Sequence, residues 1–270
     1  TMSNLRHGLA LFLAFVAVFG STFSGTVSMV ISAPATPVSS LYIALTKQPE
    51  SKVLEYLESI EDEPFNYDHP GSTDQQYSEI GEIKIPSGYR INYCTAKIGA
   101  GKHAYERAIK AIKSGENVNR LGWAGLTFPE KDPQKWAPKK PRQFGKMVAT
   151  QAFSYCAWSV NPCRVVYAKW DSSTKEGGLC SMYGYATVKG HLLSGEESFR
   201  VRWDGDKGKG GGGAVHYDML SFSRGSGPLG ALAAPFVRPI QKKFFREQIK
   251  IMKAMVGADA GQEEVKEEEQ

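Results

Sequence analysis

The chain has few of the residues from which metal sites and nucleophilic active sites are built. Its 270 residues include only 4 cysteines and 5 histidines. Cys94, Cys156, Cys163 and Cys180 form no C-x-x-C pair, and no histidine lies at zinc-finger spacing from them. A metal site is therefore not expected. If the chain is exported, one disulfide among these four remains open, and sequence alone does not choose the pair.

Two further signatures of enzymes are missing or misplaced. The sequence contains no G-x-S-x-G elbow of the serine hydrolases. The run Gly208–Gly213 satisfies G-x-G-x-x-G, but a dinucleotide fingerprint must open a helix, and Ala214–Tyr217 has the pattern of a strand. We interpret the run as a hairpin loop and expect no cofactor.

Acidic residues are absent before Glu50, and this stretch carries a targeting pattern. Arg6 and His7 precede the apolar run Leu9–Phe19, which small residues follow, as in a secretory signal peptide. The run is shorter than the about 20 residues of a membrane span. The following residues up to Pro49 are rich in Ser, Thr, Ala and Pro, as in transit peptides. We expect residues 1–48 to be a leader into the secretory route, resembling those of algae with complex plastids; secretion or membrane anchoring is the alternative.

Charge is unevenly distributed along the chain. The formal net charge is +5, yet the segment from Asp259 onward contains six acidic residues and one basic residue, Lys266. The chain before this segment is therefore strongly basic. This favours an anionic partner, with a solvated surface as the alternative. A basic helix could meet an anionic membrane through Arg238, Lys242, Lys243 and Arg246. The basic residues are not interleaved with aromatic residues that could form a stacking platform, so a nucleic-acid partner is not expected.

The hydrophobic pattern predicts an α+β domain over residues 65–256, preceded by a short docking helix within 49–64 and followed by an acidic disordered tail over 257–270. A strand (88–98) and a helix (103–113) come first. An antiparallel meander follows, with strands at 146–158, 164–170, 179–189, 197–203 and 214–223 separated by turn signals that include Asn161-Pro162. Pro235 and Pro239 predict a short helix, a break and a main C-terminal helix. This order indicates a helix-grip fold, in which a curved antiparallel sheet wraps a long C-terminal helix and encloses a cavity.

Several segments within residues 65–255 together resemble a widespread family of bacteria, plants and algae known only as a domain of unknown function (UPF-type). The segments that carry the resemblance include Phe65–Tyr67, Gly99–Gly101, Asn161–Tyr167, Tyr183–His191, Gly195–Phe199, Ser221–Arg224 and Pro235–Gln241. The resemblance implies a START/Bet v 1-like layout and no particular reaction. The loops 129–142 and 204–213 are longer than the family pattern leads us to expect.

One polar cluster and one set of aromatic residues are candidates for a site. His191 with Glu196 and Glu197 could act as acid and base at a cavity mouth; alternatively, Glu196 accepts hydrogen bonds from backbone donors and His191 lies at the surface. Strand alternation turns some aromatic side chains inward, where they line a ligand cavity or only fill the core. The candidates are Tyr155, Trp158, Tyr167, Tyr183, Tyr185 and Tyr217.

Three functions follow from these features. The first is binding of a hydrophobic or amphipathic small molecule, of the lipid, isoprenoid or pigment class, between sheet and helix. The second is an enzyme that uses the same cavity, with His191 and Glu196 or Glu197 as acid and base. The third is a subunit or assembly factor of a membrane-associated complex.

Overall fold

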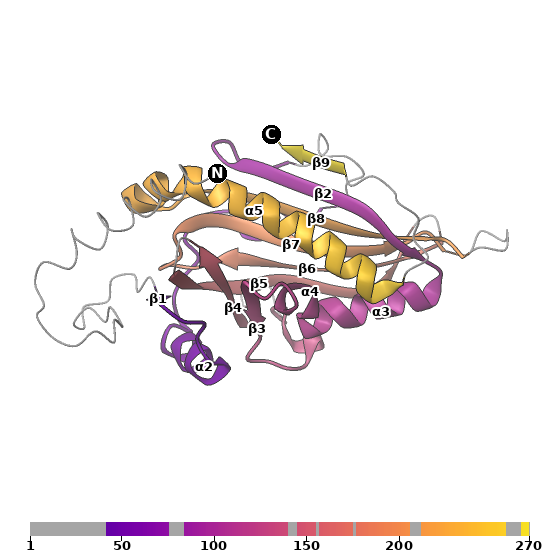
Figure 1. Cartoon of the computed structure of the whole chain (residues 1–270), viewed down its shortest axis with the longest axis horizontal. Helices are drawn as coiled ribbons and strands as arrows, with labels where there is room; N and C mark the ends of the chain where they lie inside the picture. The colour runs from indigo at the N-terminus through magenta and orange to yellow at the C-terminus, as the bar shows by residue number, and fades with distance from the viewer. Residues whose placement is uncertain are drawn as a thin grey trace, which may run out of the picture.

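We analysed a computed structural model of the chain, which describes residues 42–75, 84–139, 145–154, 157–174, 177–205, 212–257 and 266–269, and for 228–236 and 266–269 the backbone alone. Its sheet has nine antiparallel strands in the order β3-β4-β5-β6-β7-β8-β2-β9, with β1 paired to β5 (Figure 1). The strands are β1 (Tyr42–Ala44), β2 (Arg90–Ala100), β3 (Ala124–Thr127), β4 (Met147–Ser154), β5 (Ala157–Ser173), β6 (Leu179–Thr187), β7 (Leu193–Trp203), β8 (Ala214–Gly225) and β9 (Lys266–Glu269). The helices are α2 (Glu50–Ser59), α3 (Lys102–Ser114), α4 (Glu116–Asn119), the 3₁₀ turn η2 (Pro133–Lys135) and α5 (Gly227–Val256).

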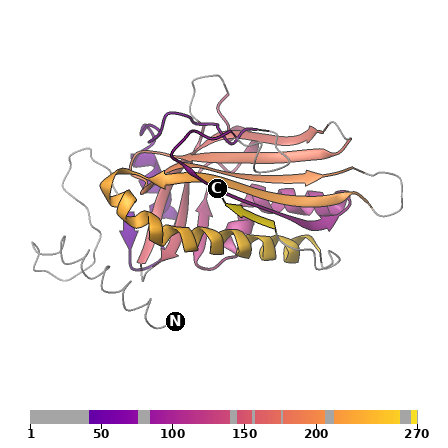
Figure 2. The same cartoon turned by 90° about the horizontal axis from the view of Figure 1, so that it is seen from above.

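The core lies between α5 and one face of the curved sheet. Helix α5 crosses that face and packs against β8, β2 and α3 (Figures 1 and 2). Its buried side chains Phe245, Ile249 and Met252 belong to the same cluster as Tyr217 and Met219 of β8. The α+β helix-grip fold expected from the sequence is therefore confirmed. Among the described helices, none is long and apolar enough to cross a membrane.

Helix α3 closes one end of this layer as its sequence pattern predicts. Tyr105, Ala108, Ile109 and Ile112 are buried on one face. The helix ends at Gly115, which adopts the left-handed conformation (φ 73°) that a side chain would disfavour.

The predicted turn at Asn161-Pro162 is wrong. The chain turns between β4 and β5, and β5 then runs straight through Pro162. The Pro162 carbonyl accepts a hydrogen bond from the Val188 backbone N–H (3.5 Å), so the proline nitrogen faces the same side. On that side β1 pairs with β5 only as far as Val160, and β6 begins to pair at Cys163. Between these two points no described strand pairs with β5 on that side, so a proline, which has no N–H, is tolerated there.

The predicted break in the C-terminal helix is also wrong, because α5 is continuous through Pro235 and Pro239. Two prolines four residues apart leave the carbonyls of residues 231 and 235 without helical donors. Pro239 is exposed, where water can satisfy such a carbonyl. Figure 2 shows the helix changing direction near its N-terminal end, as prolines in a helix commonly cause.

Both predicted terminal boundaries differ from the structure. Tyr42–Ala44, assigned above to the leader, form β1 on β5, and the Gln48 backbone donates to the Gln151 side chain (2.9 Å). Lys266–Glu269, assigned to the disordered tail, form β9 on β2. An edge strand offers unpaired N–H and C=O groups, which attract further strands. Residues 1–41 and 258–265 lie outside the described residues.

The predicted docking helix is α2. Its buried residues Val53, Tyr56 and Leu57 pack against Met147 and Val160 on the outer face of the sheet. The helix is therefore held on the domain and does not contribute to the inner core.

Candidate functional site

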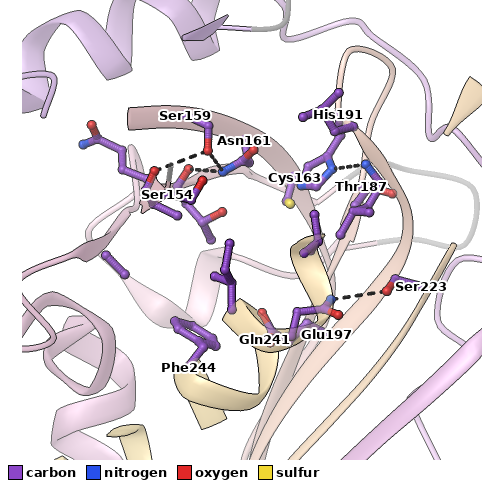
Figure 3. A pocket seen from close by; sticks show the side chains of 18 of the residues that line it. Ser154, Ser159, Asn161, Cys163, Thr187, His191, Glu197, Ser223, Gln241 and Phe244 are labelled. Atoms are coloured by element: carbon purple, nitrogen blue, oxygen red, sulfur yellow. Dashed lines mark hydrogen bonds between the residues drawn. The ribbon is translucent and has the colours of Figure 1, made fainter. Parts of the chain in front are cut away.

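A cavity of about 320 Å³ lies between the sheet and the N-terminal half of α5 (Figure 3). On the helix side it is lined by Val237, Ile240, Gln241 and Phe244. The sheet side combines apolar atoms with polar side chains, which are Thr150, Ser154, Ser159, Asn161, Cys163, Tyr185, Thr187, Glu197, Ser221 and Ser223. Farther along α5 the helix packs directly on the sheet, so the cavity occupies the part of the concave face that the helix does not fill.

Glu197 on β7 places a carboxyl group on the cavity wall. It lies opposite Tyr185 of β6, whose hydroxyl donates a hydrogen bond to Glu197 Oε2. Burial raises the pKa of Glu197 to about 7, and the bond from Tyr185 only partly opposes this. At neutral pH the group therefore exists in both the protonated and the ionised form.

His191 lines the same cavity from the turn between β6 and β7 (Figure 3). Its Nδ1 accepts a hydrogen bond from the Leu193 backbone N–H (2.9 Å). Burial lowers its pKa to about 4 although this bond acts in the opposite direction. The imidazole is therefore neutral at physiological pH, with its remaining proton on Nε2. Among the described residues, no hydrogen bond or ion pair joins His191 to Glu197.

Glu196 also borders the cavity, but its carboxylate lies on the opposite side of the sheet, as expected for the neighbour of Glu197 in a strand. Its carboxylate accepts hydrogen bonds from the Tyr67 hydroxyl (2.6 Å), the Gly71 N–H (2.7 Å), the Thr73 N–H (2.8 Å) and the Thr73 hydroxyl. Glu196 therefore holds the segment 67–73 on the convex face. The structure separates it from the cavity chemistry of Glu197.

The predicted aromatic residues occupy three different environments. Tyr185 and Trp158 line the cavity, and the Trp158 ring also packs beside Phe153 with 5.6 Å between ring centroids. Tyr183 and Tyr217 lie on the same concave face but are fully buried in the core. Tyr155 lies outside the described residues.

Tyr167 lies on the convex face, since its hydroxyl is 2.8 Å from that of Thr73. Its ring covers Gly184, where an added Cβ would lie 2.7 Å from ring atoms. A bulge between Val165 and Tyr167 shifts the alternation of β5, which the sequence pattern did not reveal.

Several cavity residues were not predicted from the sequence. Cys163, Thr187, Ser223 and Gln241 each contribute polar atoms, and Gln241 donates to the Ser223 hydroxyl (3.3 Å; Figure 3). The period-two pattern of β8 contained a usable signal, because Ser221 and Ser223 continue the inward row of Tyr217 and Met219. The positions on α5 depend on how far the helix approaches the sheet, which no local pattern encodes.

The predicted basic residues lie on the outer side of α5. Arg238, Lys242, Lys243 and Arg246 are exposed. Lys243 Nζ lies 3.9 Å from Glu247 and 4.5 Å from the centroid of the Trp123 ring. The arrangement places positive charge on the face of the helix that points away from the cavity.

The described part of the chain shows no cluster of three metal-ligating side chains. Cys94, Cys163 and Cys180 are free thiols, and Cys156 lies outside the described residues. Burial raises the pKa of Cys163 well above its usual value, and nearby Glu197 raises it further. Cys163 therefore contributes a neutral thiol to the cavity wall.

Comparison with known proteins gives a family and three relatives. The family model of a domain of unknown function, DUF1990, matches residues 76–251. A UPF0548 protein of Arabidopsis thaliana is 29% identical over 186 residues, which cover 67% of this chain and 82% of the relative. One from Dictyostelium discoideum is 27% identical, covering 79% and 95%. One from Deinococcus radiodurans is 26% identical, covering 67% and 87%.

Among solved structures, the crystal structure of Ara h 8.0201 aligns with a TM-score of 0.35 and 12% sequence identity. The alignment covers 62% of this chain and 99% of that one. This likeness is too distant to bear on function.

Proposed function

This chain belongs to the family described as a domain of unknown function, DUF1990, and from its cavity we propose that it binds a hydrophobic or amphipathic small molecule between the sheet and α5. The observation that carries the proposal is the cavity itself, whose wall is mainly apolar with polar side chains placed among the apolar atoms. Sites of this composition suit ligands that bury an apolar body and fix a polar end.

The ligand classes that fit are lipids, isoprenoids and pigments. A cavity of about 320 Å³ is at the lower end of the range for ligand pockets, which favours the smaller members of each class. Glu197 and Tyr185 provide donor and acceptor groups for the polar end of such a ligand.

Identification of the native ligand tests this proposal. The protein should be purified from its own organism, extracted with organic solvent and the extract examined by mass spectrometry. The variant Ala152→Phe, which adds a ring to the cavity wall, should lose the ligand that wild type retains. Ala254→Phe on the exposed side of α5 is the matched control and should retain it. An empty wild-type protein, or equal retention by Ala152→Phe, would overturn the proposal.

A second candidate is an enzyme that uses the same cavity, and the opposite pKa shifts of His191 and Glu197 favour it. A neutral imidazole and a protonated carboxyl group in one cavity are suited to act as base and acid. In this role Glu197 donates a proton to the ligand and His191 accepts one; Glu196 takes no part.

The test is to incubate the extracted ligand with wild type, His191→Asn and Glu197→Gln, and to follow its mass and nuclear magnetic resonance spectrum. A chemical change with wild type only, while both variants still bind, supports the enzyme. An unchanged ligand in all three samples rejects it.

The basic face of α5 supports a role beside a membrane, as a contact with anionic lipid or with a membrane-associated complex. Sedimentation with vesicles containing phosphatidylserine should decrease when Arg238, Lys242 and Arg246 are replaced by Gln. The leader predicted at residues 1–48, of which 42–48 belong to the domain, would bring the protein to such a membrane. Fusion of residues 1–41 to a fluorescent protein tests the secretory or plastid destination. Equal sedimentation of wild type and variant would argue against the membrane contact.

A further inference from the structure

Beyond the cavity, three polar side chains form a closed triangle inside the apolar core. Asn117 Nδ2 lies 2.9 Å from Gln248 Oε1 and 3.0 Å from the Tyr217 hydroxyl, which itself lies 2.9 Å from Gln248 Oε1. All three residues are completely buried. They come from α4, β8 and α5, so the triangle joins the sheet to both helices.

The triangle leaves one hydrogen-bond donor and one acceptor without a partner. Asn117 Oδ1 and Gln248 Nε2 are buried and unpaired among the described residues. If the nitrogen and oxygen of both amides are exchanged, the unpaired donor is on Asn117 and the unpaired acceptor on Gln248. If only one amide is exchanged, two oxygens or two nitrogens face each other and cannot form a hydrogen bond. Buried polar groups without partners cost free energy, so their presence calls for an explanation.

The triangle is not part of the cavity wall, but two of its residues are close in the chain to residues that line the cavity. Val118 of α4 and Phe244 of α5 line the cavity, and these helices also carry Asn117 and Gln248 of the triangle. Asn117 is adjacent to Val118, and Gln248 lies one helical turn after Phe244. Tyr183 lies two residues from Tyr185 on the same face and has a buried hydroxyl without a partner among the described residues. It also raises the pKa of Tyr217, as the largest cause apart from burial.

We propose that Asn117, Tyr217 and Gln248 form a head-group site for the cavity ligand, and that this site takes a neutral group that both donates and accepts a hydrogen bond, such as a carboxamide. The inference rests on the proposed function, because the apolar part of the ligand lies in the cavity. A charged head group is disfavoured, since among the described residues no ionised side chain bonds to the triangle. The Phe244 ring must rotate to admit the head group.

Three probes of eight carbon atoms with different polar groups test the site. Isothermal titration of the full chain should give a dissociation constant for octanamide at least about ten-fold lower than for octan-2-one, which only accepts hydrogen bonds, or for octanoate, which is charged. In the double variant Asn117→Leu/Gln248→Leu the preference for octanamide over octan-2-one should disappear while binding of octan-2-one persists. Tyr89→Phe, whose hydroxyl lies near Ser194 outside the triangle, should keep the preference.

The outcomes separate the head-group site from the cavity. Binding of octan-2-one with no preference for octanamide overturns the head-group site and leaves the proposed function standing. Binding of no probe overturns both. If the double variant does not fold, Gln248→Met takes its place. A crystal structure of the octanamide complex must show the carboxamide bonded to Asn117 and Gln248; water at these atoms with the carboxamide elsewhere also overturns the site.

Discussion

At the scale of single residues, neighbouring glutamates on β7 have different tasks because they face opposite sides of the sheet. Glu196 accepts four hydrogen bonds from the segment 67–73. In Glu196→Ala these donors lose their buried acceptor, so we expect the free energy of unfolding to fall by about 3 kcal/mol or more. Urea denaturation measures this loss, and limited proteolysis should show earlier cleavage within 67–73. A variant as stable as wild type would show that the four bonds contribute little.

His191 and Glu197 should produce opposing pH dependences of stability. The pKa of His191 is lowered from 6.5 to about 4, so its contribution is present above pH 6.5 and is lost as the pH falls toward 4. The pKa of Glu197 is raised from 4.5 to about 7, so its contribution is present below pH 4.5 and is lost as the pH rises through 7. Between these limits the two effects oppose each other in the wild type.

Single variants separate the two effects. Glu197→Gln should make the free energy of unfolding rise with pH between about 4.5 and 6.5, and His191→Asn should make it fall, each by at most about 1.4 kcal/mol per pH unit. Urea denaturation across this range measures the slopes. Glu58→Gln on the exposed face of α2 serves as the control and should follow the wild type. Parallel profiles for the two cavity variants would contradict the assignment.

At the scale of elements, α5 offers a test of its continuity. Pro239 lies inside the helix and is exposed. Alanine there restores a backbone donor and removes the clash of the ring with the preceding turn, so Pro239→Ala should raise the free energy of unfolding by about 1 to 3 kcal/mol. Circular dichroism and urea denaturation give the helix content and stability. Pro70→Ala in an exposed turn is the control and should give no such gain. An unchanged stability would instead fit a helix that begins near Pro239.

Element types were predictable from the sequence, whereas several of their boundaries were not. The alternation of β6, β7 and β8 and the apolar face of α3 are local properties, so their patterns sufficed. Pro162 and Pro239 gave misleading signals because tertiary context decides what a proline costs. Pro162 lies in a gap between β1 and β6, and Pro239 lies on the solvent side of a helix whose other face is held by the core.

At the scale of the whole molecule, the sequence predicted a sheet and a helix around a cavity but only some of the side chains that line it. His191 and Glu197, which both line the cavity, could be named as candidates because polar residues in a strand-turn-strand segment are locally visible. Gln241 and Phe244 on α5 were not predicted. The triangle was also missed, because it joins Asn117 to Tyr217 and Gln248, which are 100 and 131 residues farther along the chain. Such sites depend on the relative placement of helix and sheet, which is a property of the completed fold.

The cavity should also set a balance between stability and binding in the whole protein. An unfilled space under α5 deprives its lining of van der Waals contacts, and this lowers the stability of the ligand-free protein. Ala152→Phe fills part of that space from β4, so we expect the free energy of unfolding to rise by about 0.5 to 2 kcal/mol in the absence of ligand. Added ligand stabilises the wild type through mass action and should not stabilise this variant. Thermal denaturation with and without octan-2-one measures both effects, with Ala254→Phe as the surface control. A loss of stability would show that the ring is strained, and a ligand response equal to that of the wild type would place the binding site outside the cavity.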